Sequence, residues 1–196
     1  MSPAHLIIVA ATGAALLIGP ASRAHADGSV TIIGTSPLAA CSAAAAQAKR
    51  TGIGSRAGLE ACGRAIEAWP SPQFQVATAY VNRSVIRLAR DDVVGAEADA
   101  GAAIRLDGTI AEAYLDRGIA LSAQHRCAEA IGDFAHALSL RLPRPELAYF
   151  DRAVAREDSG DIKGAYFDYR QAADINPGWD EPRHELARFR ISVISN

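Results

Sequence analysis

A five-residue motif occurs three times in this chain of 196 residues. The motif reads Ala-Tyr-x-Asn/Asp-Arg and covers residues 79–83, 113–117 and 148–152, at steps of 34 and 35 residues. A period of this length is typical of helical repeats, in which each unit is a helix pair that cannot bury its apolar face alone. Stacked units bury a continuous core and leave an extended binding surface. The spacing therefore predicts an all-α solenoid.

Small side chains recur at two positions of each unit when the chain is aligned on Ala96, Ala130 and Ala165. Two helices cross at close range only where no side chain larger than a methyl or hydroxymethyl group stands between them. In the last unit, Gly160 can end the first helix and Asp161 can cap the second. The small residues are Ala46, Ser84, Gly118, Ala153 and Ala187 in first helices, and Ala65, Ala103, Ala137 and Ala172 in second helices.

In this register the chain resembles the tetratricopeptide repeat family, whose signature places aromatic residues at the fourth and twenty-fourth positions and proline at the thirty-second. The residues that match are Tyr80, Tyr114 and Tyr149 at the fourth, Phe134 and Tyr169 at the twenty-fourth, and Pro70 and Pro177 at the thirty-second. The resemblance implies a domain over residues 38–196. It implies four units, at about 39–74, 77–110, 111–145 and 146–179, and a capping helix over 180–195.

The beginning of the chain is typical of an exported protein. Residues 6–18 are apolar and uncharged, and Ala24-His25-Ala26 follows as a small-residue cleavage site. The apolar run is shorter than the roughly 20 residues of a membrane-spanning helix. We expect residues 1–26 to be a signal peptide and residues 27–37 to be a flexible N-terminal segment. The mature protein is then periplasmic or secreted, without stable membrane insertion.

Export to an oxidising compartment would allow a disulfide to form between two of the three cysteines. Cys41 and Cys62 occupy facing positions of the first helix pair, which predicts a disulfide worth about 3 kcal/mol. An alternative is that Leu38-Ala39-Ala40-Cys41 resembles the lipobox of bacterial lipoproteins, although the apolar run ends well before it, at Ile18. Cys127 remains unpaired, either as a small buried residue or in an intermolecular bridge.

Catalytic, metal-binding and nucleic-acid-binding patterns are missing from the sequence. No serine or cysteine stands in a nucleophile motif, and no two histidines have metal-ligand spacing. The acidic residues Asp91, Asp92, Glu97 and Asp99 lack the spacing of a calcium loop, and Asp91 is better explained as a helix cap. The formal net charge of −2 and the lack of a basic block argue against nucleic acid. We expect no enzyme activity and no cofactor.

The family resemblance implies a concave groove, lined by the first helix of every unit, that binds a partner. The residues it places there are Val81, Asn82, Val85, Leu115, Asp116, Ile119, Phe150, Asp151 and Val154, an apolar surface with an acidic ladder. Two interpretations of that ladder are open. In one, arginines tie successive units together, Arg83 to Asp116 and Arg117 to Asp151, with Arg152 at the corresponding position of the last unit. In the other, the aspartates receive basic groups of a bound peptide.

These observations together predict a non-enzymatic scaffold or adaptor of the bacterial cell envelope that binds a protein or peptide in the groove. The alternative is a structural module that self-associates through Cys127 or through the exposed ends of the stack. The sequence identifies no partner.

Overall fold

A computed structural model describes residues 35–68 and 70–189 of the chain. The predicted signal peptide and most of the predicted flexible segment lie outside the described residues. The chain divides into two units, Met1–Ser36 and Pro37–Asn196, and every helix described belongs to the second. Within the described ranges the regular structure is entirely helical. The helices are α1 Pro37–Thr51, α2 Arg56–Glu67, α3 Gln73–Leu88, α4 Val93–Leu106, α5 Ala111–Ala123, α6 Cys127–Ser139, α7 Pro145–Asp158, α8 Ile162–Ile175 and α9 Glu181–Leu186.

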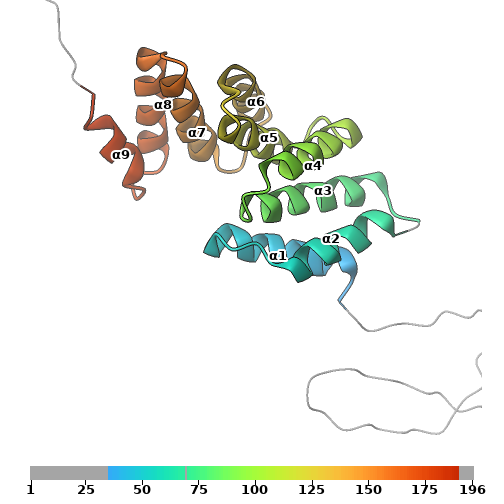
Figure 1. The fold of residues 1–196 in the computed structure, drawn as a ribbon. Helices are drawn as coiled ribbons and strands as arrows, with labels where there is room; N and C mark the ends of the chain where they lie inside the picture. The colour runs from blue at the N-terminus through green and yellow to red at the C-terminus, as the bar shows by residue number, and fades with distance from the viewer. Residues whose placement is uncertain (1–34, 69, 190–196) are drawn as a thin grey trace, which may run out of the picture. The chain divides into compact units, whose positions relative to one another are not determined.

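The helices are arranged as successive antiparallel pairs, α1/α2, α3/α4, α5/α6 and α7/α8, followed by α9 (Figure 1). Each helix packs against the next one in the chain. The first helices of neighbouring pairs also pack against each other, α1 on α3, α3 on α5 and α5 on α7. This arrangement confirms the predicted all-α solenoid, with four helix pairs and one terminal helix in the described part of the chain.

Aspartate caps begin the second helix in two of the pairs. An Oδ1 atom of Asp92 accepts a hydrogen bond from the backbone N–H of Gly95 at 3.0 Å, and Asp161 does the same for Gly164 at 2.9 Å. The prediction that Asp91 caps a helix is wrong by one residue. Asp91 lies in the preceding turn, where its φ of 61° excludes it from the capping position.

The turn inside each of the pairs α3/α4, α5/α6 and α7/α8 places one residue in the left-handed backbone region. The residues are Asp91, His125 and Gly160, with φ values of 61°, 60° and 86°. They are separated by 34 and 35 residues and so occupy the same position of each unit. Glycine adopts this conformation without a steric cost, whereas a side chain at Cβ is strained there. The predicted role of Gly160 at the end of α7 is confirmed.

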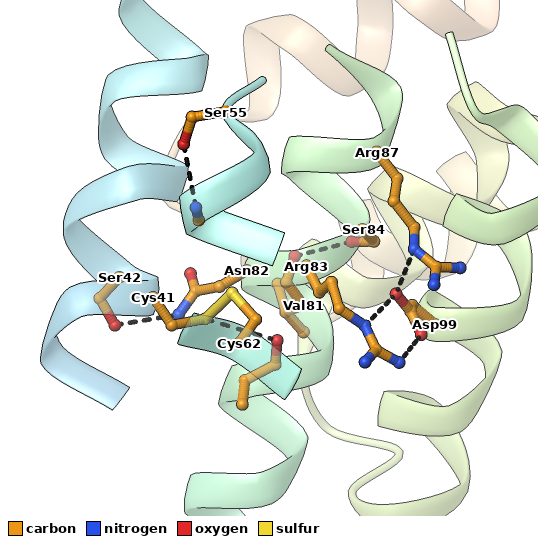
Figure 2. The surroundings of a disulfide bond; sticks show 12 residues. Cys41, Ser42, Ser55, Cys62, Val81, Asn82, Arg83, Ser84, Arg87 and Asp99 are labelled. Carbon is orange, nitrogen blue, oxygen red and sulfur yellow. Dashed lines mark hydrogen bonds and ion pairs between the residues drawn. A yellow bond between two sulfur atoms is a disulfide. The ribbon is translucent and has the colours of Figure 1, made fainter. Parts of the chain in front are cut away.

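The repeated motif forms a stacked ion pair inside each of the last three helix pairs. Arg83 donates to the Asp99 carboxylate from Nε at 2.8 Å and from Nη2 at 2.7 Å (Figure 2). The guanidinium carbon of Arg83 also lies 5.4 Å from the ring centre of Tyr80, three residues earlier. The same arrangement joins Arg117 to Asp133 over Tyr114, and Arg152 to Asp168 over Tyr149.

The predicted ion pairs between units, Arg83 with Asp116 and Arg117 with Asp151, are therefore wrong. Each motif arginine points toward the second helix of its own unit, where an aspartate sixteen residues later lies opposite. Asp116 instead accepts a hydrogen bond from Ser84 Oγ, at 2.5 Å, across the contact between α3 and α5. The units are joined here by a hydroxyl and a carboxyl group.

Seven of the nine small residues predicted at helix crossings are buried, and Ala46 and Ala187 are exposed. In α1 the buried face carries Ala45 and Ala48, so the register of this helix is one residue away from the predicted one. Ala187 lies beyond the last residue of α9.

The predicted capping helix is shorter than expected within the described residues, because α9 ends at Leu186. The following backbone tightens, and Phe189 N donates to Leu186 O at 3.1 Å, three residues earlier. This turn lets the Phe189 ring pack against Tyr166 and Tyr169, at centroid distances of 5.7 and 6.0 Å. The aromatic contact closes the C-terminal end of the core.

The predicted disulfide between Cys41 and Cys62 is confirmed (Figure 2). Both cysteines are fully buried, and Val85 and Ile86 of α3 belong to the same core cluster. The Sγ atom of Cys41 is part of this bond and therefore does not carry a lipid in this structure. Cys127 is a free thiol, half-buried at the first residue of α6.

Candidate binding groove

The first helices of the four pairs and the α6–α7 connection surround a pocket of about 470 Å³, which we call the groove pocket. Its lining is mostly apolar. The apolar residues are Ala48 of α1, Val85 and Leu88 of α3 with Ala89, Leu115 and Ile119 of α5, Leu142 and Pro143 of the connection, and Leu147 of α7. A pocket of this size and composition is typical of sites that enclose an apolar group and orient it with a few polar ones.

Four of the nine predicted groove residues line this pocket, namely Val85, Leu115, Asp116 and Ile119. The other five lie elsewhere. Val81 packs against Ala103 and Ala113 in a buried cluster between α3, α4 and α5. Phe150 and Val154 pack around Tyr169 at the C-terminal end of the core.

The polar side chains of the predicted ladder are also not the exposed row that the sequence suggested. Asn82 Nδ2 donates to Ser42 Oγ of α1 at 3.0 Å (Figure 2). Asp151 has no hydrogen bond or ion pair with any residue that the structure describes, and burial raises its pKa to about 7. A carboxyl group in such surroundings is costly to ionise.

Asp116 is the one acidic side chain of the ladder that reaches the groove pocket. Its side chain lies between α5 and α3, and the residue is only 5% exposed. Burial is the main cause that raises its pKa, to about 7, and the hydrogen bond from Ser84 and the charge of Lys49 act in the opposite direction. Asp116 is therefore a weak counter-ion for a basic ligand, but its carboxyl group offers a fixed polar contact in an apolar wall.

Charged residues of both signs surround the groove pocket. Lys49 and Glu112 contribute from α1 and α5, and Arg144 from the α6–α7 connection. Arg144 is itself engaged, because its Nε lies 3.1 Å from Glu146 Oε1. The pocket therefore combines an apolar interior with a rim of mixed charge, and it has no bias toward a strongly basic or strongly acidic ligand.

Sequence reasoning missed several lining residues that helical spacing could have indicated. Leu88 lies three residues after Val85 and shares its face of α3. Glu112 lies three residues before Leu115 on α5. The contributions of Leu142 and Pro143 have no such signal, because they belong to a connection whose path depends on how α6 and α7 pack.

The described residues offer no group of three or more His, Cys, Asp or Glu side chains that could hold a metal ion. Over the same residues, none of the helices combines the length and apolar character needed to cross a membrane.

The geometry defines a class of fold, an all-α solenoid built from successive helix pairs. A solved structure with a similar fold, described as the crystal structure of MamA protein, superposes with a TM-score of 0.55 at 17% sequence identity. The match covers 81% of this chain and 81% of that one. No protein-family profile matches the sequence, and no curated protein matches it. At this identity the likeness shows the fold alone.

Proposed function

We propose that this protein is a protein-interaction scaffold whose groove pocket binds apolar side chains of a partner polypeptide. The observation that carries the proposal is the groove pocket itself, an apolar cavity lined by the first helices of the four pairs and by the α6–α7 connection. Apolar anchors that fill such pockets supply most of the affinity in peptide-binding grooves. The mixed rim charge and the buried Asp116 would orient the chain that carries the anchor.

We further propose that the protein acts outside the cytoplasm, in the periplasm or as a secreted protein. The predicted signal peptide supports this location. The Cys41–Cys62 disulfide supports it as well, because such bonds persist in oxidising compartments and are rare in the cytosol.

Selection of peptides from a random library tests the groove as the binding site. Leu147 is half-buried and lines the pocket, so Leu147→Glu would place a charge in the apolar wall. We expect peptides selected on the native protein to share bulky apolar residues and to bind the variant at least tenfold more weakly, which corresponds to about 1.4 kcal/mol.

Phe167→Glu provides the matched control, because Phe167 is a large apolar side chain that is 50% exposed on α8 and does not line the pocket. This variant should bind the selected peptides with unchanged affinity. Peptides that bind the Leu147→Glu protein as tightly as the native one would show that the groove pocket is not the site.

A further inference from the structure

The aspartate of the stacked ion pair binds two arginines in two of the units. In the α3/α4 pair, Asp99 Oδ2 accepts from Arg83 Nε at 2.8 Å and lies 3.1 Å from Arg87 Nε (Figure 2). In the α7/α8 pair, Asp168 Oδ2 accepts from Arg152 Nε and from Arg156 Nη1, both at 2.8 Å. The second arginine approaches the same carboxylate oxygen in both units.

The α5/α6 pair between them lacks the second arginine. Asp133 Oδ2 accepts from Arg117 Nε at 2.6 Å, and no second guanidinium of the described chain reaches that oxygen. The position of Arg87 and Arg156 is held by Leu121. The side chain of Asp133 is correspondingly more exposed, at 10%, than those of Asp99 and Asp168, at 5% and 4%.

A second difference accompanies the first. We call the α3/α4 and α7/α8 pairs the outer units and the α5/α6 pair between them the middle unit. In the outer units the carboxylate of the helix-capping aspartate, Asp92 or Asp161, lies 3.7 Å from the second arginine. In the middle unit that position is Arg126, which turns away to pair with Glu129 at 2.6 Å and with Glu97 at 2.7 Å. Leu121 and Arg126 line the space in front of Asp133, but neither pairs with its carboxylate.

A cavity of about 400 Å³ occupies this space, between α4, α5 and α6. Its charged lining consists of three carboxylates and two guanidinium groups, which leaves one net negative charge. The charged residues are Glu97, Glu129 and Asp133, with Arg117 and Arg126. This cavity is separate from the groove pocket, and the two share no lining residue.

We propose that this cavity binds the guanidinium group of an arginine side chain presented by another polypeptide, which takes the place that Arg87 and Arg156 hold in the neighbouring units. A planar guanidinium matches the free lone pairs of a carboxylate and supplies the missing positive charge. Arg117 and Arg126 are already paired, as are Glu97 and Glu129. Nothing in the lining is therefore left to hold the free ammonium and carboxylate of an unlinked amino acid, so a side chain of a polypeptide fits better.

Titration with Nα-acetyl-arginine amide, followed by the backbone amide resonances of Gly132 and Glu129, tests the proposal. We expect saturable shifts and an affinity at least tenfold higher than for the neutral analogue Nα-acetyl-citrulline amide. Free arginine should bind within about threefold of the blocked amide. Equal binding of the citrulline compound would overturn the guanidinium assignment, and much tighter binding of free arginine would overturn the polypeptide source.

The double variant Leu121→Arg/Arg126→Asp rebuilds in the middle unit the set of side chains found in the outer units. Because two sister units fold with this set, the variant should keep its melting temperature and lose affinity for the arginine amide at least tenfold. A folded double variant that binds as the native protein does would overturn the proposal.

A milder variant keeps the test decisive if the double substitution does not fold. Glu129→Gln changes a side chain that is 58% exposed and brings the lining to neutrality, so the affinity should fall at least threefold. Glu60→Gln, with a similarly exposed carboxylate on α2, should leave the affinity unchanged. An unchanged affinity in the Glu129→Gln protein would contradict the proposal.

Discussion

Gly118 of α5 lies directly against the ring of Phe134 of α6. A Cβ atom at Gly118 would be 2.6 Å from Phe134 Cε1, closer than two carbon atoms approach without displacement. In the preceding unit the same two positions hold Ser84 and Ala100, and the smaller Ala100 leaves room for a hydroxymethyl group. At this crossing the Phe134 ring therefore occupies the space of a Cβ atom at position 118, whereas in the following unit Ala153 packs in one cluster with Tyr169.

Gly118→Ala should destabilise the protein, by about 1–3 kcal/mol, because the added methyl group overpacks the α5/α6 crossing. The sign is informative, since alanine inside a helix is ordinarily about 1 kcal/mol more stable than glycine. Urea denaturation of the two proteins measures the difference. In a Phe134→Ala background the same substitution should become neutral or stabilising, and a stabilising effect in the native background would show that the ring does not fill this space.

Asp99→Asn should cost about 3–5 kcal/mol of unfolding free energy, because it leaves Arg83 and Arg87 without their carboxylate in a partly buried site. At pH 5, where the Asp116 carboxyl group is protonated in the folded protein, Asp116→Asn should cost less than about 1 kcal/mol, because an amide oxygen can still accept the hydrogen bond from Ser84. Denaturant melts of both variants rank the two sites. The reverse order would favour ion pairs between units over the pairs within units described above.

The helix pairs, the buried small residues and the disulfide could be predicted from the sequence because they depend on spacing alone. The partners of the motif arginines could not. Asp116 and Arg117 are neighbours in the sequence, and their side chains leave α5 about 100° apart. The rotation of α5 about its own axis therefore decides which of the two faces α6. That rotation is set by packing, and the Tyr114 ring beneath the guanidinium is part of it.

The register of α1 and the lining of the groove pocket escaped prediction for related reasons. Residues 43–46 are four consecutive alanines, and such a run carries no pattern that marks the inward residue. Five of the thirteen lining residues come from α1 and from the α6–α7 connection, whose positions relative to α5 depend on how the helix pairs stack. The three residues predicted on α5, Leu115, Asp116 and Ile119, do line the pocket, whereas only Val85 of the three predicted on α3 does.

His125→Gly should stabilise the protein by about 1 kcal/mol, because His125 holds a φ of 60° in the turn where the last pair has Gly160. The gain is reduced by the greater entropy of glycine in the unfolded chain. Thermal and urea denaturation measure it. Gly160→Ala, at the equivalent turn, should destabilise by a comparable amount, and a loss of stability in the His125→Gly protein would show that the histidine side chain makes a contact that outweighs its backbone strain.

Asp151→Asn should make the protein more stable at neutral and alkaline pH. Burial raises the pKa of Asp151 to about 7 from an ordinary value of 3.8, so the folded state binds more protons than the unfolded state between these values. The contribution of Asp151 to the unfolding free energy therefore falls as pH rises from about 4 to 7 and is constant above. An amide does not ionise, so the variant should gain up to about 4 kcal/mol over the native protein at pH 8 and little at pH 4.

Urea denaturation of the native and variant proteins at pH 4, 6 and 8 measures this gain. Asp116 titrates in the same range in both proteins, so the difference between them isolates Asp151. Asp158→Asn, on an exposed position of the same helix, controls for the loss of one negative charge and should show no such pH-dependent difference. Parallel stability curves for the native and Asp151→Asn proteins would mean that the Asp151 carboxyl group is solvated or paired in solution.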